Sequence, residues 1–232
     1  MTHLIELAGI KKSYQLGSTD VVALRGVDLT VDAGEFTVVT GPSGSGKTTL
    51  LNIIGCLDRA SSGTYQLDGI DVSNRDFDDL AEVRNQKIGF IFQNFNLIPV
   101  LNVAENIEFP CTVRKGGESA AALRQRVEAL ALSVGLDKYL HHKPDELSGG
   151  QRQRVAIARA LITQPRLVLA DEPTANLDSK TSEQIIDLML ALNREQQVTF
   201  LFSTHDPRVV KHARRALQIR DGAMVDGAMD AH

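Results

Sequence analysis

Nine residues near the start of the chain have the types and spacing of a phosphate-binding loop: Gly41-Pro42-Ser43-Gly44-Ser45-Gly46-Lys47-Thr48-Thr49. They fit the pattern G-x-x-x-x-G-K-[ST]. Glycines let the backbone curve round a phosphate with its N–H groups pointing inward. Lys47 would reach the β- and γ-phosphates, and the Thr48 hydroxyl would ligate Mg²⁺. A Gly-rich turn with an exposed lysine is the alternative, but the stretch favours nucleotide binding.

Two neighbouring carboxylates are candidates for the chemistry at such phosphates. Asp171 ends the apolar run 167–170, which places it to hold Mg²⁺ at the end of a strand. Glu172 follows directly and is not needed for the metal, so we interpret it as a base that orients or deprotonates the attacking water. A surface pair at a strand end is the alternative, and the phosphate loop in the same chain weakens it.

A second Gly-rich element comes about a hundred residues later, at Leu147-Ser148-Gly149-Gly150-Gln151. Ser148 is a candidate N-cap of the following helix, so its amide groups would form another anion-binding helix end. One nucleotide cannot easily occupy both loops of one chain. We therefore expect two chains, packed head to tail, to bring one loop of each to a shared nucleotide.

The surrounding pattern predicts the elements that position these residues. Residues 36–40 form a short apolar, β-branched run, and 50–57 have apolar residues at helical spacing, which gives strand, loop and helix in the required order. Residues 4–10, 27–31 and 63–69 read as further strands, with a loop at 12–17. We expect these strands to form one mixed sheet with the phosphate loop in its middle.

The rest of the chain changes character twice. Residues 94–150 read as helical, with helices expected over about 103–111 and 118–134, and form a predicted insert. Strands expected at 87–93, 167–171 and 198–203, with helices at 152–162 and 181–192, imply a parallel sheet with right-handed crossovers. We predict one domain over 1–232, with a nucleotide-binding core at 1–93 and 151–232. The tail, 223–232, is expected to be a hairpin arm with a frayed end.

Composition narrows the possible partners. Of the 232 residues 43% are hydrophobic and 23% charged, which is ordinary for a globular domain, and the net charge of −4 without a basic block argues against a nucleic-acid partner. Cys56 and Cys111 match no metal spacing, and Cys56 is expected to be a buried small hydrophobe. No stretch approaches ~18 apolar residues, so any service to a membrane would go through a partner.

These motifs together resemble the ATP-binding subunit of an ABC transporter, in order and over nearly the whole chain. The resemblance implies an α/β fold, a P-loop NTPase of ABC type with a mixed, mostly parallel core sheet, an antiparallel β subdomain and an inserted α-helical subdomain. Residues 41–48 match its Walker A loop, 147–151 its signature and 167–171 its Walker B strand. Asn176-Leu177-Asp178 matches its D-loop.

The resemblance also implies residue roles. Tyr14 stands where the family stacks an aromatic ring on adenine, with a half-buried core tyrosine as the alternative. Gln93 would ligate Mg²⁺ and the attacking water, and His205 would bond the γ-phosphate. Glu172 stands at the catalytic glutamate, and Asp178 would touch the opposite subunit. Two copies would clamp two ATP molecules, and hydrolysis would let them part.

Several short stretches, for example 52–58 and 169–178, resemble the corresponding sequences in the branch of lipoprotein-release (LolD-like) and macrolide-efflux (MacB-like) ATPases. The resemblance implies an ATPase at the cytoplasmic face of the membrane, attached through permease subunits. The apolar loop of Phe95, Leu97, Ile98 and Pro99 is a hypothetical seat for a permease helix; packing inside the insert is the equal alternative. A non-transport ABC ATPase and a nucleotide-sensing module remain as other functions, although no long coiled-coil insertion is present.

Overall fold

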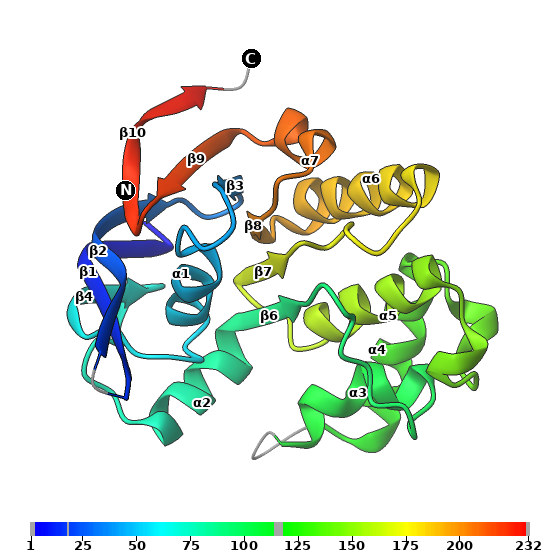
Figure 1. Cartoon of the computed structure of the whole chain (residues 1–232). Helices are drawn as coiled ribbons and strands as arrows, with labels where there is room; N and C mark the ends of the chain where they lie inside the picture. Colours follow the sequence, from blue (N-terminus) through cyan, green and yellow to red (C-terminus); the bar gives the residue numbers. More distant parts are fainter. Residues whose placement is uncertain (1–2, 18, 114–117, 231–232) are drawn as a thin grey trace.

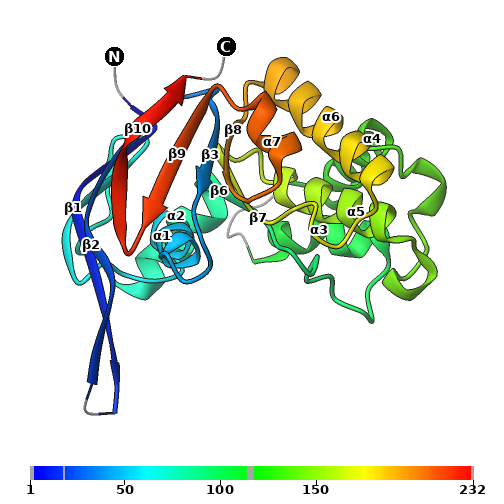
Figure 2. The same cartoon turned by 45° about the horizontal axis from the view of Figure 1, so that its top comes forward.

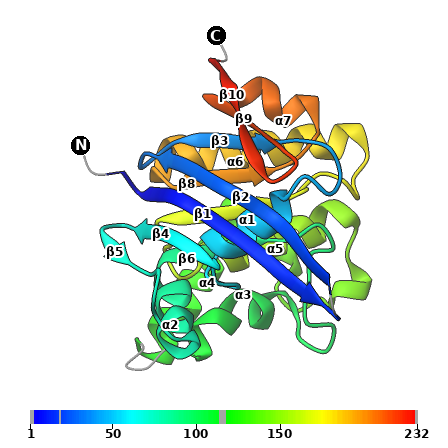
Figure 3. The ribbon, with the colours of Figure 1, turned by 60° about the vertical axis from the view of Figure 1, so that its left-hand side comes forward.

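The computed structural model describes residues 3–17, 19–113 and 118–230, and it contains two sheets flanked by helices (Figure 1). The first sheet is antiparallel and consists, in spatial order, of β2 (Thr19–Val31), β1 (Ile5–Leu16), β4 (Ser62–Leu67) and β5 (Ile70–Asp71). The long β1–β2 hairpin extends away from the rest of the chain (Figure 2). Figure 3 shows this sheet covering α1 (Lys47–Ile54).

The second sheet carries the phosphate loop. Its spatial order is β10 (Ala223–Asp230), β9 (Arg215–Arg220), β3 (Phe36–Thr40), β8 (Thr199–Ser203), β7 (Leu167–Asp171) and β6 (Ile88–Ile91). The pairs from β9 to β6 are parallel, whereas β10 folds back antiparallel on β9. The carboxyl ends of these parallel strands therefore meet at one edge, where ligands bind in open α/β sheets.

Alternating residues of the central strands pack into two separate cores. Val168 and Ala170 of β7 belong to one core, and Leu167 and Leu169 to the other. Successive side chains of a strand point to opposite faces, so a strand covered on both faces is apolar throughout. One core lies against the antiparallel sheet and α1, and the other contains side chains of the helices that follow β6.

Those helices form a group on one side of the parallel sheet (Figures 1 and 2). In chain order they are α3 (Val103–Thr112), α4 (Ala120–Ser133), the short 3₁₀ turns η1 (Asp137–Tyr139) and η2 (Pro144–Glu146), and α5 (Gly149–Leu161). Helix α5 also lies directly on β6, because a Cβ at Gly89 would stand 2.2 Å from the Ala160 carbonyl oxygen. The remaining helices are α2 (Phe77–Lys87), α6 (Ser179–Gln196) and α7 (Pro207–His212).

Two expectations about the first third of the chain were wrong. Strand β1 continues through the stretch 12–16, which we expected to be a loop, because its hairpin partner β2 pairs with it up to Leu16. The phosphate loop does not lie in the sheet of β1, β2 and β4, since β3 pairs only with strands from the last third of the chain. The strand predicted at 27–31 is the end of the longer β2, which begins at Thr19 because it pairs with β1 along the hairpin. The other predicted strands and helices are present with shifts of a few residues at their ends, and the expected hairpin arm is β10 paired with β9; residues 231–232 lie outside the described part.

No helix in the described ranges is both long and apolar enough to cross a bilayer. Cys56 is buried as expected, although it lies two residues beyond the end of α1 and not on the helix.

Candidate functional site

The phosphate loop joins β3 to α1 and has the backbone that its glycines permit. Gly41 and Gly46 have φ angles of +155° and +107°, which L side chains rarely adopt. A Cβ at Gly41 would stand 2.2 Å from the Ile219 carbonyl oxygen, and one at Gly46 would stand 2.8 Å from that of Ala23. The sequence therefore needs glycine at both positions for conformation and for space.

Lys47 lies over its own loop, where Nζ donates hydrogen bonds of 2.7 Å to the Gly41 carbonyl and 3.0 Å to that of Pro42. Burial raises the pKa of Asp171 above its ordinary value. A hydrogen bond with Ser203 opposes this shift, the charge of Glu172 adds to it, and the charge of Lys47 opposes it more weakly. A cation bound at this edge of the sheet would stabilise the ionised form of Asp171, which burial disfavours.

Strand register brings Asp171 level with the phosphate loop. Ser203 of β8 pairs with Val39 of β3 on one side and with Asp171 of β7 on the other. Asp171 is therefore level with Val39, two strands away, and Val39 is followed by Thr40 and the phosphate loop. The oxygen donors proposed for the metal are the Thr48 hydroxyl, the Gln93 amide and the Asp171 carboxylate, a set of hard ligands that suits Mg²⁺.

Glu172 adopts a left-handed backbone with φ of +45°, which an ordinary residue rarely does. Its N–H donates to the Ser203 carbonyl at 2.8 Å, so the strained turn is anchored to β8. Its carboxylate accepts a 2.8 Å hydrogen bond from Thr204 Oγ1 and lies 2.6 Å from His205 Nδ1. The structure thus brings Glu172 and His205, which were predicted separately, into contact, and it adds Thr204.

The segment from Gln93 onwards is tied to the predicted D-loop. Asn176 Nδ2 donates to the Gln93 carbonyl at 2.9 Å and to Asn94 Oδ1 at 3.0 Å. The Gln93 side chain itself is exposed. Asn176 was predicted only as part of a motif, and a contact between residues 83 positions apart has no sequence signal.

The second Gly-rich turn begins α5 as predicted, with Ser148 as N-cap. Ser148 Oγ accepts from the Gln151 N–H, and Gln151 Oε1 accepts from the Ser148 N–H, which forms a capping box. The turn packs on the start of α6: a Cβ at Gly150 would stand 2.5 Å from Thr181 Cγ2. Asp178 caps α6 and accepts from the Thr181 N–H and hydroxyl, at 3.0 and 2.6 Å.

The two Gly-rich loops do not form one site within a single chain. Helices α1 and α5 lie in different parts of the molecule in Figures 1 and 2. Across the described residues, no hydrogen bond or ion pair joins 41–49 to 148–151. This separation is what the head-to-tail arrangement of two chains requires.

Tyr14 lies on β1 close to the end of α1. Its hydroxyl donates a 2.8 Å hydrogen bond to Asp58 Oδ2, and Lys12 Nζ lies 4.8 Å from its ring centroid and 2.6 Å from Asp58 Oδ1. Burial and the bond to Asp58 raise the pKa of Tyr14, and Thr49 opposes them. The half-buried ring is therefore near the last residue of the predicted phosphate loop.

The loop predicted to seat a permease helix is partly internal. Leu97 packs against the core of the helical group, and the Ile98 N–H donates to the buried Asn106 side chain at 2.8 Å. Arg152 lies 5.4 Å from the Phe95 ring centroid, whereas Pro99 is exposed. Of the two alternatives for this loop, docking of a permease helix or packing inside the helical insert, Leu97 follows the second.

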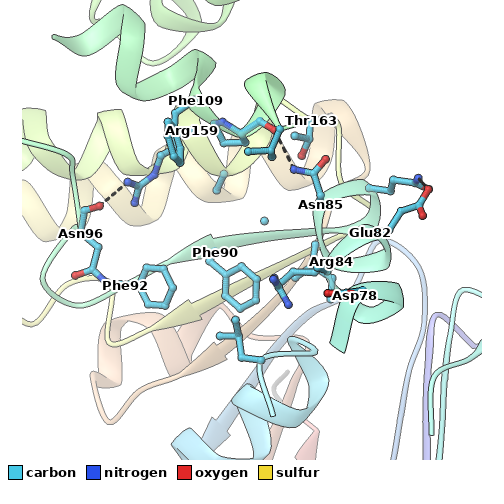
Figure 4. Close-up of a pocket in the computed structure, with 18 of the residues that line it drawn as sticks. Asp78, Glu82, Arg84, Asn85, Phe90, Phe92, Asn96, Phe109, Arg159 and Thr163 are labelled. Atoms are coloured by element: carbon cyan, nitrogen blue, oxygen red, sulfur yellow. Dashed lines mark hydrogen bonds between the residues drawn. The ribbon is translucent and has the colours of Figure 1, made fainter. Parts of the chain in front are cut away.

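A groove of about 830 Å³ lies beside this loop, between α2, β6 and α3 (Figure 4). Its apolar lining includes side chains that are otherwise left in solvent, such as Phe109, which is 42% exposed, and Val113. Asp78, Asp79 and Glu82 of α2 supply carboxylates along one wall. This groove has no local sequence signal because its lining comes from distant segments.

The comparisons identify the class of protein. A family model described as ABC transporter matches residues 24–175, and the chain belongs to this family as an ATP-binding domain and an ABC-type ATPase. It is 52% identical to the ATP-binding protein YvrO of Bacillus subtilis, over 96% of both chains. It is also 52% identical to the macrolide export ATP-binding/permease protein MacB of Syntrophobacter fumaroxidans, over 95% of this chain and 31% of the relative. The chain thus spans about a third of that relative's length.

A solved structure confirms the expected fold. The ATP-binding cassette MJ0796, in a dimeric post-hydrolysis state bound to ADP and Pi, matches with a TM-score of 0.89 and 43% identity over 98% of this chain and 99% of that one. The sequence of MJ0796 from Methanocaldococcus jannaschii is 45% identical over 94% of each chain. The predicted LolD/MacB-like branch is confirmed by these relatives.

Proposed function

We propose that the chain binds MgATP at the edge of its parallel sheet and hydrolyses it only between two copies. The observation that carries the proposal is the separation of the two Gly-rich loops, each built for an anion at a helix end. The solved relative, a dimeric cassette bound to ADP and Pi, supports it. In this arrangement Ser148, Gly149, Gly150 and Gln151 of one copy cover the ATP held by the other, and Asp178 lies at the contact.

Within one copy, the loop 41–49 would cradle the phosphates. Lys47 would exchange its two carbonyl partners for β- and γ-phosphate oxygens. Because Thr49, at the end of the loop, lies near Tyr14, the adenine base of the bound nucleotide would lie next to the Tyr14 ring. Stacking on Tyr14 suits adenine because the ring is held at its far end by Asp58. Thr48, Gln93 and Asp171 would hold Mg²⁺, which supplies charge neutralisation at the phosphates.

Glu172 is the proposed general base. Its carboxylate is held by Thr204 and His205, so it has a fixed direction before substrate arrives. Water would attack the γ-phosphorus, the bond to the ADP oxygen would break, and Glu172 would accept the water proton. His205 is well placed to turn from Glu172 to the γ-phosphate, since its ring is 80% exposed.

The experiment that tests the nucleotide-dependent dimer uses Glu172→Gln, which keeps the shape of the side chain but removes the base. This variant is expected to double its mass on gel filtration when MgATP is added and to remain monomeric with MgADP. The proposal would be contradicted if this variant stayed monomeric at every protein concentration while MgATP was raised to about 100-fold above its dissociation constant.

We further propose that the chain is bound to permease subunits at the cytoplasmic face of a membrane and powers export-type or extrusion-type movement there. The MacB relative, whose name joins ATP-binding and permease functions in one chain, supports this partnership. The groove beside residues 95–99 is the proposed seat, because it combines exposed apolar side chains with carboxylates of α2. Pro99 and Phe95 would lie at its margin.

A pair of matched variants tests this seat. Phe109→Asp places a charge in the groove, whereas Leu132→Asp alters a side chain that is 64% exposed elsewhere on α4. Phe109→Asp is expected to abolish co-purification with the permease encoded beside the chain, and Leu132→Asp to leave it intact. Retained binding and coupling in Phe109→Asp would move the seat elsewhere.

A further inference from the structure

Two consecutive residues after Gln93 have an unusual backbone. Phe95 and Asn96 have φ angles of +61° and +48°, in the left-handed region that most side chains avoid. Asparagine tolerates this region, but phenylalanine does so at a cost. Such a conformation persists only where surrounding groups hold it, and it often occurs where a segment has a functional position to keep.

The group that holds this strained pair is Arg159 of α5. Its guanidinium donates a 2.7 Å hydrogen bond from Nη2 to the Phe95 carbonyl and a 2.5 Å bond from Nη1 to the Asn96 carbonyl. Burial lowers the pKa of Arg159, and none of the ion pairs among the described residues supplies it with a carboxylate. A half-buried cation is thus committed to two carbonyls of one strained turn.

The same segment is held at its other end by Asn176, through the Gln93 carbonyl and the Asn94 side chain. The four residues 93–96 are therefore hydrogen-bonded to α5 at one end and to the D-loop at the other. The Gln93 side chain projects from this segment, because Gln93 is exposed while its backbone carbonyl is held by Asn176.

We propose that Arg159 is a positioning residue for Gln93: by clamping the Phe95 and Asn96 carbonyls it fixes the segment from which the Gln93 amide reaches the metal of bound MgATP. This inference rests on the proposed role of Gln93 as a Mg²⁺ ligand. Arg159 would act only through the Phe95 and Asn96 carbonyls and is not among the residues proposed to bind the nucleotide.

Its location gives the clamp a second consequence. Arg159 and Asn96 both line the groove, and Figure 4 shows their hydrogen bond in its wall. Helix α5 begins directly after its N-cap Ser148 and carries Arg159 near its other end. A segment seated in the groove would therefore contact the residue that connects Gln93 to the helix of the signature turn.

The test measures how much Mg²⁺ strengthens nucleotide binding. The dissociation constant of a fluorescent ATP analogue is determined with Mg²⁺ and with EDTA, and the ratio of the two values reports the metal ligands. Arg159→Gln is expected to reduce this ratio about tenfold, as losing support for a metal ligand does. Binding in EDTA should stay within a factor of two, and Arg159→Lys should give an intermediate ratio.

The matched control is Arg154→Gln. Arg154 lies on the same helix and donates to the Val134 carbonyl at 2.8 Å, so its loss removes a similar bond away from Gln93. It should leave the ratio unchanged. Arg159→Gln combined with Asn96→Gly, which relieves the left-handed strain, should regain thermal stability without regaining the ratio.

Gln93→Ala separates the two levels of the argument. If Gln93→Ala lowers the ratio and Arg159→Gln does not, the clamp is only structural and the inference is overturned while the role of Gln93 stands. If Gln93→Ala leaves the ratio unchanged, both the metal role of Gln93 and the inference fail. A return of the ratio in the Arg159→Gln, Asn96→Gly double variant would also overturn the inference, because stability alone would then explain the loss.

Discussion

The two glycines of the signature turn should respond very differently to alanine. A Cβ at Gly150 would stand 2.5 Å from Thr181 Cγ2, whereas one at Gly149 would meet Leu177 Cδ2 at 3.4 Å, an ordinary contact. To make room, Thr181 must rotate, and its 2.6 Å hydrogen bond to Asp178 is then lost. Gly150→Ala should therefore disturb the cap of α6, and Gly149→Ala should not.

The size of the difference follows from three terms. Both alanines gain up to about 1 kcal/mol of helix propensity, so this term cancels in the comparison. Overpacking at Gly150 costs about 1–3 kcal/mol, a range that already includes the weakened cap. For a chain of this length each kcal/mol shifts the unfolding midpoint by about 2–4 °C. Gly150→Ala should thus unfold roughly 2 to 12 °C below Gly149→Ala.

The assay is thermal unfolding of both variants without nucleotide, followed by circular dichroism. Thr181→Ser provides an internal check, because serine lacks the methyl group but keeps the hydroxyl that bonds Asp178. It should restore most of the lost stability to Gly150→Ala. Equal midpoints for the two alanine variants, or no rescue by Thr181→Ser, would refute the packing of the signature turn on α6 described above.

Three other outcomes are expected. Burial raises the pKa of Asp206, but hydrogen bonds from Arg208 and Thr174 outweigh it and bring the pKa from 3.8 to about 2. The ionised carboxylate therefore stabilises the fold fully above about pH 4, and this stabilisation is lost as the pH falls toward 2. Asp206→Asn should make the unfolding midpoint less dependent on pH over that range. Tyr14→Ala should weaken binding of a fluorescent ATP analogue roughly 5- to 100-fold, as base stacking is worth about 1–3 kcal/mol, whereas Tyr14→Phe keeps the ring and most of the affinity; equal affinities would contradict stacking. Burial raises the pKa of Cys56 to about 11, so a thiol reagent at pH 8 should modify it only after unfolding in urea, and rapid labelling of the folded chain would show that the thiol is accessible.

The buried strands and the Gly-rich turns could be predicted from the sequence because their signals are local. Residues 167–170 of β7 and 200–202 of β8 are apolar without alternation, which reflects burial on both faces. The positive φ angles of Gly41 and Gly46 explain the spacing of the loop. Glu172 could be singled out from its place after β7, and its role as a base stays a prediction; the structure adds that it contacts His205.

Other features depend on contacts that no local pattern encodes. In the hairpin part of β1, none of residues 12–15 is fully buried: Lys12 and Tyr14 are half-buried, and Ser13 and Gln15 are exposed. A stretch without a buried apolar residue gives little strand signal, and we predicted a loop there. The partners of β3 come more than 150 residues later, which is why its sheet was assigned wrongly. Arg159 resembles any helix arginine in sequence; only the fold brings it to the Phe95 and Asn96 carbonyls.

The central claim, a site shared between two copies, can be tested by complementation in a Glu172→Gln background. One variant adds Lys47→Ala and the other adds Ser148→Arg, so each lacks one half of the site and should remain monomeric alone with MgATP. Mixed together, they have one intact site, formed by Lys47 of one copy and Ser148 of the other. Analytical ultracentrifugation should then show a heterodimer that depends on MgATP. A mixture that stays monomeric under conditions in which Glu172→Gln alone dimerises would contradict the shared site.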